Sequence, residues 1–266
     1  MPFVKMHGLG NDFVLLDNLN GAPLLSESQA RFLADRRLGI GCDQVVQLLP
    51  AQQGCDVRMV IFNPDGSQAE MCGNAVRCLG RYLWQRRAFD KQTLSVETLA
   101  GDIRIIQAGT DLISVEMGQP VLVNGDDAVS LSVNGADYRV TEVSMGNPHC
   151  VIFDPSVEDV PLAEVGPLIE NHQRFPNRTN VEFVSITDNA HIRMRVWERG
   201  AGITPACGTG ACASAVAAMV HGHVGRHVSV ELDGGILDIQ WRASDDQVIM
   251  TGTATHVFDG EIRLSL

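Results

Sequence analysis

The sequence repeats part of itself at about half its length, and this repeat restricts the fold more than any other feature. In a chain of 266 residues, the pair Gly10-Asn11 recurs as Gly146-Asn147, 136 residues later. The pair Cys72-Gly73 recurs as Cys207-Gly208, 135 residues later. Such turn pairs also occur by chance in a glycine-rich chain, but two of them at nearly one offset favour a duplicated fold. We therefore expect two similar lobes.

Polar residues extend the repeat. Asn63 and Glu198 each end a strand-like run nine residues before a Cys-Gly pair, and Gln44 corresponds to Asn180 at an offset of 136 residues. We expect these positions to converge on one ligand in a cleft between the lobes. Because Asn63 corresponds to Glu198, the pocket need not be symmetric. Such a pocket can accept only one configuration at a second stereocentre of its ligand.

Short alternating apolar runs predict many strands. We expect them at Phe3–His7, Val14–Asp17, Val45–Leu49, Asp56–Asn63, Leu94–Glu97, Ile103–Gln107, Ala128–Val133, Tyr138–Met145, Cys150–Asp154, Val181–Thr187, Ile192–Trp197, Val228–Leu232, Leu237–Trp241 and Val248–Thr251. These runs do not alternate regularly with helices, which argues against a doubly wound parallel sheet.

Four helices are predicted. Their expected positions are from a cap at Ser26 to Arg37, Gly73–Arg86, Pro161–His172 with a possible break at Pro167, and Gly208–Val220. The last is apolar on every side, as buried helices are. The expected fold is α/β of the mixed α+β type: two pseudo-symmetric lobes, near residues 1–116 and 117–253, each a sheet wrapped around a buried central helix.

Composition excludes several classes of protein. Thirty-two acidic residues against twenty basic ones give a net charge of −12, which argues against binding to nucleic acid. No apolar run is long enough for a membrane span, and Met1–Gly10 lacks the pattern of a secretory signal. The seven cysteines show neither CxxC nor metal-ligand spacing, and their number is odd. We therefore expect a cytoplasmic protein with free thiols and no metal site.

The two Cys-Gly pairs suggest chemistry. A cysteine at a helix N-terminus lies beside unpaired N–H groups and the positive end of the helix dipole, so we expect lowered pKa values for the thiols of Cys72 and Cys207. Two such helix starts can also hold a carboxylate between them. The backbone N–H groups that would bind it belong to Gly73, Asn74, Gly208 and Thr209.

With one sulfur on each face of the carbon next to that carboxylate, one thiolate removes a proton and the opposite thiol delivers another. This scheme predicts a racemase or epimerase that needs no cofactor. The alternative is that both cysteines are merely small buried side chains. A redox-switched binding protein with a Cys72–Cys207 disulfide, and a cysteine hydrolase, are further alternatives. The hydrolase fits less well because it needs one nucleophile and a base.

At these residues the chain strongly resembles the diaminopimelate epimerase family. The motifs MHGLGNDFVLLD, GIGCDQ, FNPDGSQAEMCGNAVRC, GNPHCV, RTNVEF, ERGAGITPACGTGACA and MTGTATHVF follow the family's order over almost the whole chain. The resemblance implies interconversion of LL- and meso-diaminopimelate by two cysteines, without cofactor, for lysine and peptidoglycan precursor synthesis. It also implies a cytoplasmic homodimer, and a C-terminal strand, 254–266, that returns to the first lobe.

The resemblance assigns roles residue by residue. Cys72 and Cys207 correspond to the acid/base pair, and His149 and Glu198 to residues that tune the two sulfur pKa values. The substrate contacts it implies are Asn11, Gln44, Asn63, Gly73, Asn74, Asn147, Asn180, Glu198, Arg199, Gly208 and Thr209. Arg199 suits the carboxylate of the non-reacting end, and oxygens of Asn63 and Glu198 suit its ammonium group.

One position departs from the family pattern, and one rival remains. The family commonly has another glycine after Cys-Gly-Asn, where this chain has Ala75-Val76. The departure concerns how closely the first lobe's backbone approaches the carboxylate. The rival is a proline racemase or hydroxyproline epimerase of the same architecture, which fits a single small amino acid. Cys72-Gly73-Asn74 and Glu198-Arg199 favour the longer, two-ended substrate.

Overall fold

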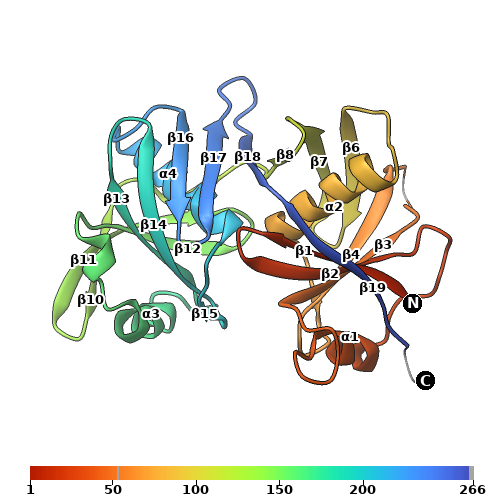
Figure 1. Cartoon of the computed structure of the whole chain (residues 1–266). Coiled ribbons are helices and arrows are strands. Elements are labelled where there is room, and N and C mark those ends of the chain that lie inside the picture. The colour runs from red at the N-terminus through yellow and green to blue at the C-terminus, as the bar shows by residue number, and fades with distance from the viewer. Residues whose placement is uncertain (53, 264–266) are drawn as a thin grey trace. The chain divides into compact units, whose positions relative to one another are not determined.

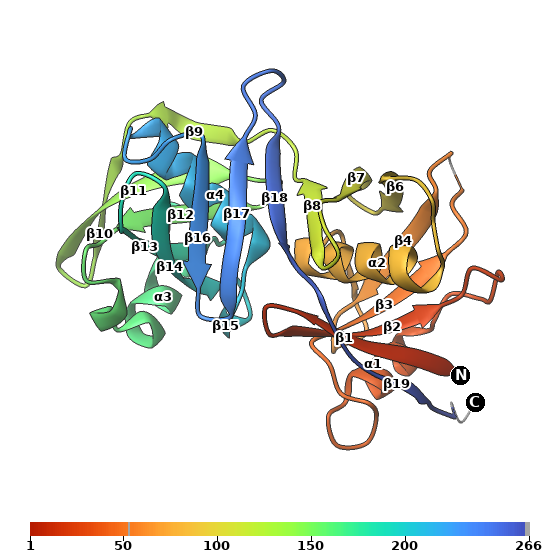
Figure 2. The same ribbon diagram turned by 45° about the horizontal axis from the view of Figure 1, so that its top comes forward.

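The computed structural model describes residues 1–52 and 54–263 (Figure 1). The chain forms two compact units. Unit 1 comprises Met1–Val115 and Gly252–Leu266, and unit 2 comprises Glu116–Thr251. Each unit consists of strands and a small number of helices, and Figure 2 shows both in a second orientation.

Unit 1 is built around the helix α2. Its elements are β1 (Pro2–Gly8), β2 (Asn11–Asp17), α1 (Glu27–Ala34), β3 (Gln44–Leu49), β4 (Val57–Phe62), β5 (Gln68–Ala69), α2 (Gly73–Arg86), β6 (Thr93–Thr98), β7 (Gly101–Gln107), β8 (Leu112–Glu116) and β19 (Thr255–Glu261). Strand β19 pairs with β1, so residues from the two ends of the chain share one ladder.

Unit 2 is built around the helix α4. Its elements are β9 (Val121–Asp126), β10 (Val129–Val133), β11 (Ala136–Ser144), β12 (Pro148–Phe153), the short helix η1 (Val157–Asp159), α3 (Leu162–Glu170), β13 (Asn180–Ile186), β14 (His191–Glu198), β15 (Gly202–Ile203), α4 (Gly208–Val220), β16 (His227–Leu232), β17 (Gly235–Trp241) and β18 (Val248–Thr253).

The two units repeat one topology. In unit 1, β1 and β2 are antiparallel, β2 and β3 are parallel, β3 and β4 are antiparallel, and β4 and β6 are parallel. In unit 2, β11, β12, β13, β14 and β16 pair in the same sequence of directions. The helices α1 and α3 occupy equivalent crossovers, as do α2 and α4. The predicted mixed fold with two similar lobes is confirmed.

The central helices are buried, as predicted. In α4 the small residues Ala211, Ala213, Ala215 and Ala217 are fully buried, and the helix contacts strands on several sides (Figure 1). Its small side chains let strands pack closely around it. In α2, Ala75 is fully buried in the first turn, so the family departure at this position still forms a helix start.

The other two helices are shorter than predicted. Helix α1 ends at Ala34 rather than Arg37 because the Asp35 carboxylate accepts hydrogen bonds from the backbone N–H groups of Arg37 and Leu38, which turns the chain. Helix α3 spans Leu162–Glu170 and continues through Pro167. The predicted break is therefore wrong.

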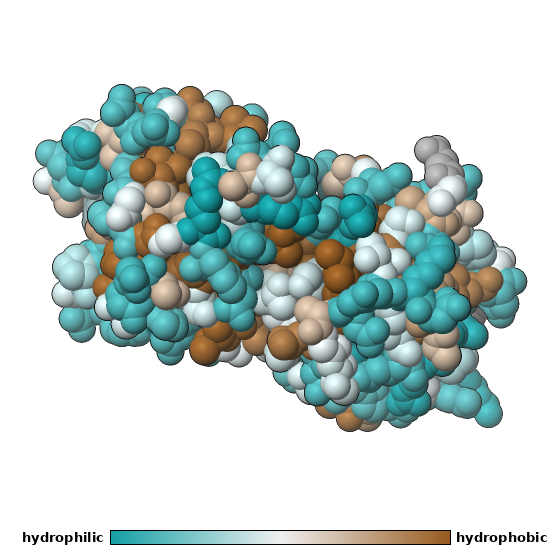
Figure 3. Space-filling model, turned by 90° about the horizontal axis from the view of Figure 1, so that it is seen from above, coloured by the Kyte–Doolittle hydropathy of each residue, from teal (hydrophilic) through white to brown (hydrophobic). Residues whose placement is uncertain are grey.

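Four short or exposed strands were not predicted: β5, β8, β9 and β15. Strand β9 alternates exposed and half-buried residues and contains Gly125, so its sequence lacks a strong apolar period. Among the described residues, no helix combines the length and apolar composition needed to cross a membrane. Figure 3 shows one face of the molecule, on which polar side chains predominate and apolar ones form separate areas.

Candidate active site

The polar residues predicted in unit 1 gather at one end of its sheet. Strands β2 and β3 are parallel and begin at Asn11 and Gln44, whereas β4 runs the opposite way and ends just before Asn63. All three residues therefore lie at the same end of the sheet. Gln44 Nε2 donates a hydrogen bond of 2.9 Å to Asn63 Oδ1, which fixes both side chains.

Cys72 lies directly before α2, as the N-cap residue of that helix. Its thiol donates to Asn11 Oδ1 at 3.7 Å, and Asn74 Nδ2 donates to the same oxygen at 3.1 Å. Gly73 and Asn74 are the first two residues of the helix, where backbone N–H groups have no intrahelical acceptor. The structure thus places the cysteine, the helix start and Asn11 together.

A cluster of charged residues, which the sequence reasoning missed, supports Asn11. Asp43 Oδ2 accepts hydrogen bonds of 3.0 Å from Asn11 Nδ2 and from the backbone N–H of Asp12. Arg36 bridges the two carboxylates at 2.6 and 2.8 Å, and Lys5 bonds to Asp12. Burial alone would raise the pKa of Asp12, but the hydrogen bonds from Arg36 and Lys5 hold it well below its usual range. Asn11 is thereby held on a rigid support.

Unit 2 repeats this arrangement around Cys207, the N-cap residue of α4. The Cys207 side chain is only 4% exposed, and its Sγ accepts a hydrogen bond of 3.3 Å from the backbone N–H of Gly210. Gly208 and Thr209 are the first two helical residues, and Thr209 Oγ1 lies 3.7 Å from the sulfur. The sulfur therefore faces polar groups of its own helix start.

The predicted lowering of the thiol pKa is wrong for Cys207. Burial raises the pKa of this thiol well above its usual value, and the negative charges of Glu198 and Glu182 raise it further. The helix start opposes this, because the N–H of Gly210 and the hydroxyl of Thr209 lower the pKa, but the net shift is upward. Burial and the two carboxylates therefore favour the protonated form of Cys207.

Glu198 ends β14 and contacts Cys207 directly. Its carboxylate accepts hydrogen bonds from the Thr204 hydroxyl and from the Cys207 thiol. Burial raises the pKa of Glu198, and those two hydrogen bonds lower it in part. The charge of Glu198 in turn raises the pKa of the Cys207 thiol. Thr204 was not among the predicted residues.

The remaining predicted residues of unit 2 lie at the same end of its sheet. Strands β12 and β13 are parallel, with His149 opposite Asn180, and the antiparallel β14 ends beside them. Asn180 Nδ2 donates to the Pro148 carbonyl, and Asn180 Oδ1 accepts from the backbone N–H of Arg199, each at 2.9 Å. The Arg199 side chain is exposed, and Nη1 donates to the Asn177 carbonyl at 3.2 Å.

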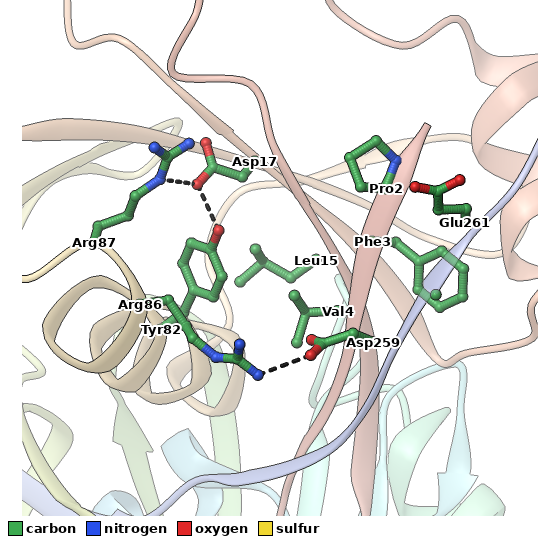
Figure 4. Close-up of a pocket in the computed structure, with 11 residues that line it drawn as sticks. Pro2, Phe3, Val4, Leu15, Asp17, Tyr82, Arg86, Arg87, Asp259 and Glu261 are labelled. Atoms are coloured by element: carbon green, nitrogen blue, oxygen red, sulfur yellow. Dashed lines mark hydrogen bonds and ion pairs between the residues drawn. The ribbon is translucent and has the colours of Figure 1, made fainter.

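A cavity of about 630 Å³ in unit 1 lies away from these residues (Figure 4). Two ion pairs cross its wall, Arg87–Asp17 and Arg86–Asp259, and the Tyr82 hydroxyl donates to Asp17. None of the eleven residues drawn is a cysteine or a predicted site residue. Among residues 1–52 and 54–263, no three potential metal ligands are grouped.

The fold is shared with solved structures of a probable proline racemase and a phenazine biosynthesis protein. It matches the probable proline racemase from Agrobacterium radiobacter K84 with a TM-score of 0.74 at 16% identity, covering 99% of this chain and 93% of that one. A phenazine biosynthesis protein of the PhzF family from Bacillus anthracis matches with a TM-score of 0.75 at 19% identity, covering 99% of each chain. At this level of identity, the likeness concerns the fold alone.

Sequence comparison identifies the family. The model of the family "Diaminopimelate epimerase" matches residues 3–123 and 141–257. A diaminopimelate epimerase from Magnetococcus marinus is 55% identical over 269 residues, which cover 98% of this chain and 96% of that protein. The chain belongs to the diaminopimelate epimerase family and is an isomerase.

Proposed function

We propose that this chain interconverts LL- and meso-diaminopimelate by moving the α-proton between two cysteines. The observation that carries the proposal is the equivalent placement of Cys72 and Cys207, each the N-cap of the central helix of one repeat unit. Family membership supplies the substrate class. No cofactor takes part in this scheme, because the thiols perform both proton transfers.

In the proposed reaction, the substrate α-carboxylate binds to backbone N–H groups at the two helix starts. The thiolate of one cysteine takes the α-proton, so the C–H bond breaks and an S–H bond forms. Negative charge moves into the carboxylate, where the N–H groups and helix dipoles stabilise it. The other cysteine gives its proton to the opposite face of the carbon, which inverts the stereocentre. The two sulfurs then have exchanged protonation states.

The raised pKa of the Cys207 thiol supports a role as the proton donor. In this scheme, a protonated Cys207 serves as the acid for one direction of the reaction, and Cys72 is its partner as the base. A further turnover in the same direction requires that the two sulfurs first exchange protons with solvent. This pairing of one thiol with one thiolate is what a proton exchange across a carbon requires.

The polar residues around each cysteine are proposed to bind the rest of the substrate. In unit 1 these are Asn11, Gln44, Asn63, Gly73 and Asn74. In unit 2 they are Asn147, Asn180, Glu198, Arg199, Gly208 and Thr209. The exposed guanidinium of Arg199 suits the distal carboxylate, and the oxygens of Asn63 and Glu198 suit the distal ammonium group. His149 and Glu198 are proposed to tune the sulfur pKa values.

We also propose that the protein works as a cytoplasmic homodimer in lysine and peptidoglycan precursor synthesis. The resemblance to the family supports this setting, and the odd number of cysteines fits a reducing compartment. Light scattering coupled to size-exclusion chromatography measures the oligomeric state directly. A mass near 28.8 kDa would contradict the dimer.

The test is proton NMR of the reduced protein with LL-diaminopimelate in deuterated water. We expect deuterium to enter the α-position as the meso isomer forms. Cys72→Ala and Cys207→Ala should each slow turnover by about 100-fold or more, the low end of what general acid–base groups contribute. Cys55→Ala, a half-buried cysteine outside both half-sites, is the matched control and should keep full activity.

Three outcomes would contradict the proposal. They are absence of exchange with diaminopimelate, exchange with proline or hydroxyproline in its place, and loss of turnover in only one of the two cysteine variants. The last would favour a hydrolase-like use of a single thiol.

A further inference from the structure

A carboxylate absent from the predicted site lies beside Cys207. Glu182 is on β13, two residues beyond Asn180, so both side chains point to the same face of the strand. Its Oε1 lies 2.6 Å from His149 Nδ1, and both side chains have no exposed surface. A Cβ atom added at Gly210 would lie 2.8 Å from Glu182 Oε1 and 3.2 Å from Cys207 Sγ. The glycine thus makes room for this carboxylate at the helix start.

A chain of hydrogen bonds runs from Glu182 to the sulfur. After the contact of Glu182 with His149, Nε2 of the ring lies 3.0 Å from Asn147 Oδ1. Asn147 Nδ2 donates to Thr209 Oγ1 at 3.2 Å, and that oxygen lies 3.7 Å from Cys207 Sγ. All five residues belong to unit 2.

The chemistry of each group fixes the direction of this chain. Asn147 gives its NH₂ group to Thr209, so its oxygen, which only accepts, faces the His149 ring. The Glu182 carboxylate also only accepts. With Glu182 ionised and the amide in this orientation, both ring nitrogens of His149 act as donors. Because Thr209 Oγ1 receives a hydrogen from Asn147, its own hydrogen is available to Cys207 Sγ.

We propose that Glu182 is a positioning residue that keeps both protons on His149 and thereby directs the Thr209 hydroxyl to donate to Cys207 Sγ. This inference rests on the proposed function of Cys207. With only one ring proton, on Nδ1, the bare Nε2 would attract the NH₂ group of Asn147. The amide would turn, its oxygen would accept the Thr209 hydrogen, and the sulfur would lose a donor when it becomes a thiolate.

Other titratable groups lie beside this chain of hydrogen bonds. Glu198 on β14 contacts Cys207, and Cys150, next to His149, has a pKa raised well above its usual value by burial and by Glu182 and Glu142. Arg174 lowers that pKa and bonds to Glu142. Glu182 Oε2 is buried and has no hydrogen-bond partner among the described residues. The contact with His149 is thus the principal stabilisation of the carboxylate, and its loss would leave a buried charge.

The first test is ¹⁵N NMR of the histidine rings in the reduced protein at neutral pH. The His149 signals are assigned by their loss in His149→Asn. We expect both His149 nitrogens to carry protons in the unaltered chain and one of them to lose its proton in Glu182→Gln. A bare ring nitrogen in the unaltered chain would overturn the proposal. This spectrum needs no turnover, so it separates the inference from the proposed function.

The second test is kinetic. Glu182→Gln should lower kcat about tenfold and leave KM within about twofold, because the residue acts through others and does not contact substrate. The thiol of Cys207 should titrate at higher pH. The substitution also removes the Glu182 charge, which raises the pKa of this thiol, so a net rise requires that the effect of the lost hydrogen bond exceed that of the lost charge. Glu182→Asp should restore part of the activity.

Glu142→Gln is the matched control. Glu142 is a carboxylate on β11, the strand that pairs with β12, and like Glu182 it raises the pKa of Cys150. It should leave kcat and the Cys207 titration unchanged. The double variant Glu182→Gln/Thr209→Val should lose little more kcat than Thr209→Val alone, because both substitutions interrupt the same chain of hydrogen bonds. Fully additive losses, or an unchanged Cys207 titration in Glu182→Gln, would contradict the inference.

Discussion

Asn74 Nδ2 donates a hydrogen bond of 3.1 Å to Asn11 Oδ1. The equivalent pair in unit 2 is Thr209 and Asn147, joined at 3.2 Å, but there the helix residue accepts and Asn147 donates. The duplicated fold has kept the position of this bond and reversed its polarity. The Cys72 thiol donates to the Asn11 oxygen, whereas Cys207 Sγ accepts from its own helix start. The two half-sites are alike in placement and different in electrostatics.

This difference predicts how Cys207 titrates. In Glu198→Gln, a negative charge that raises the pKa of the Cys207 thiol is removed, so the thiol should ionise at lower pH. The measurement is the ultraviolet absorbance of the thiolate against pH, as the difference between each protein and its Cys207→Ala derivative. The shift is opposite in sign to that expected for Glu182→Gln. A rise, or no change, in Glu198→Gln would show that Glu198 does not act on the sulfur by charge.

Gly210 should tolerate no side chain. A methyl group there meets the Glu182 carboxylate and the Cys207 sulfur at distances below ordinary contact. We expect Gly210→Ala to lower the unfolding free energy by about 1–3 kcal/mol and to reduce kcat, because the sulfur and the carboxylate must move apart. Gly225→Ala is the control. No atom lies within 4 Å of its added methyl, so stability should change by less than about 0.5 kcal/mol.

Arg77 should contribute to stability far more than a surface arginine does. It is fully buried on α2, and its Nε donates to the Thr253 carbonyl at 3.2 Å. One turn later Arg81 donates to the Ala254 carbonyl, so α2 holds the start of β19 at two points. Arg77→Met should cost about 2 kcal/mol, the value of a hydrogen bond from a charged donor.

Denaturant unfolding monitored by circular dichroism measures this cost. Arg31→Ala serves as the comparison, because Arg31 pairs with Glu27 at 3.5 Å while 53% exposed. Exposed pairs contribute at most about 1 kcal/mol. Equal losses in the two variants would argue against a special role for Arg77.

The parts of the site that could be predicted are those encoded locally. The Cys-Gly pairs, the helices that follow them and the polar residue nine positions earlier are all visible at short range. The offset of the repeat then relates Asn11 to Asn147 and Gln44 to Asn180 without any structure. Helix α2 and helix α4 have the limits expected from the sequence.

The parts that could not be predicted depend on contacts between distant segments. Glu182 lies 33 positions from His149 along the chain, and Asp43 lies 32 positions from Asn11. The predicted residues Asn180 and Gln44 could have indicated them. Glu182 lies two residues from Asn180 and so on the same face of the strand, and Asp43 directly precedes Gln44 at the start of its strand. The predicted direction of the Cys207 pKa shift was wrong because burial and two carboxylates outweigh the effect of one helix start.

The ladder between β1 and β19 has a consequence for biosynthesis. The amino group of Met1 donates to the Ile262 carbonyl at 2.7 Å, and β1 is paired with β19 along most of its length. During translation β1 leaves the ribosome before unit 2, whereas its partner β19 is made after unit 2. Unit 2 is continuous in sequence and is complete earlier. The nascent chain therefore carries an open strand edge at β1 until β19 has been made, which is the interval in which it most needs protection from aggregation.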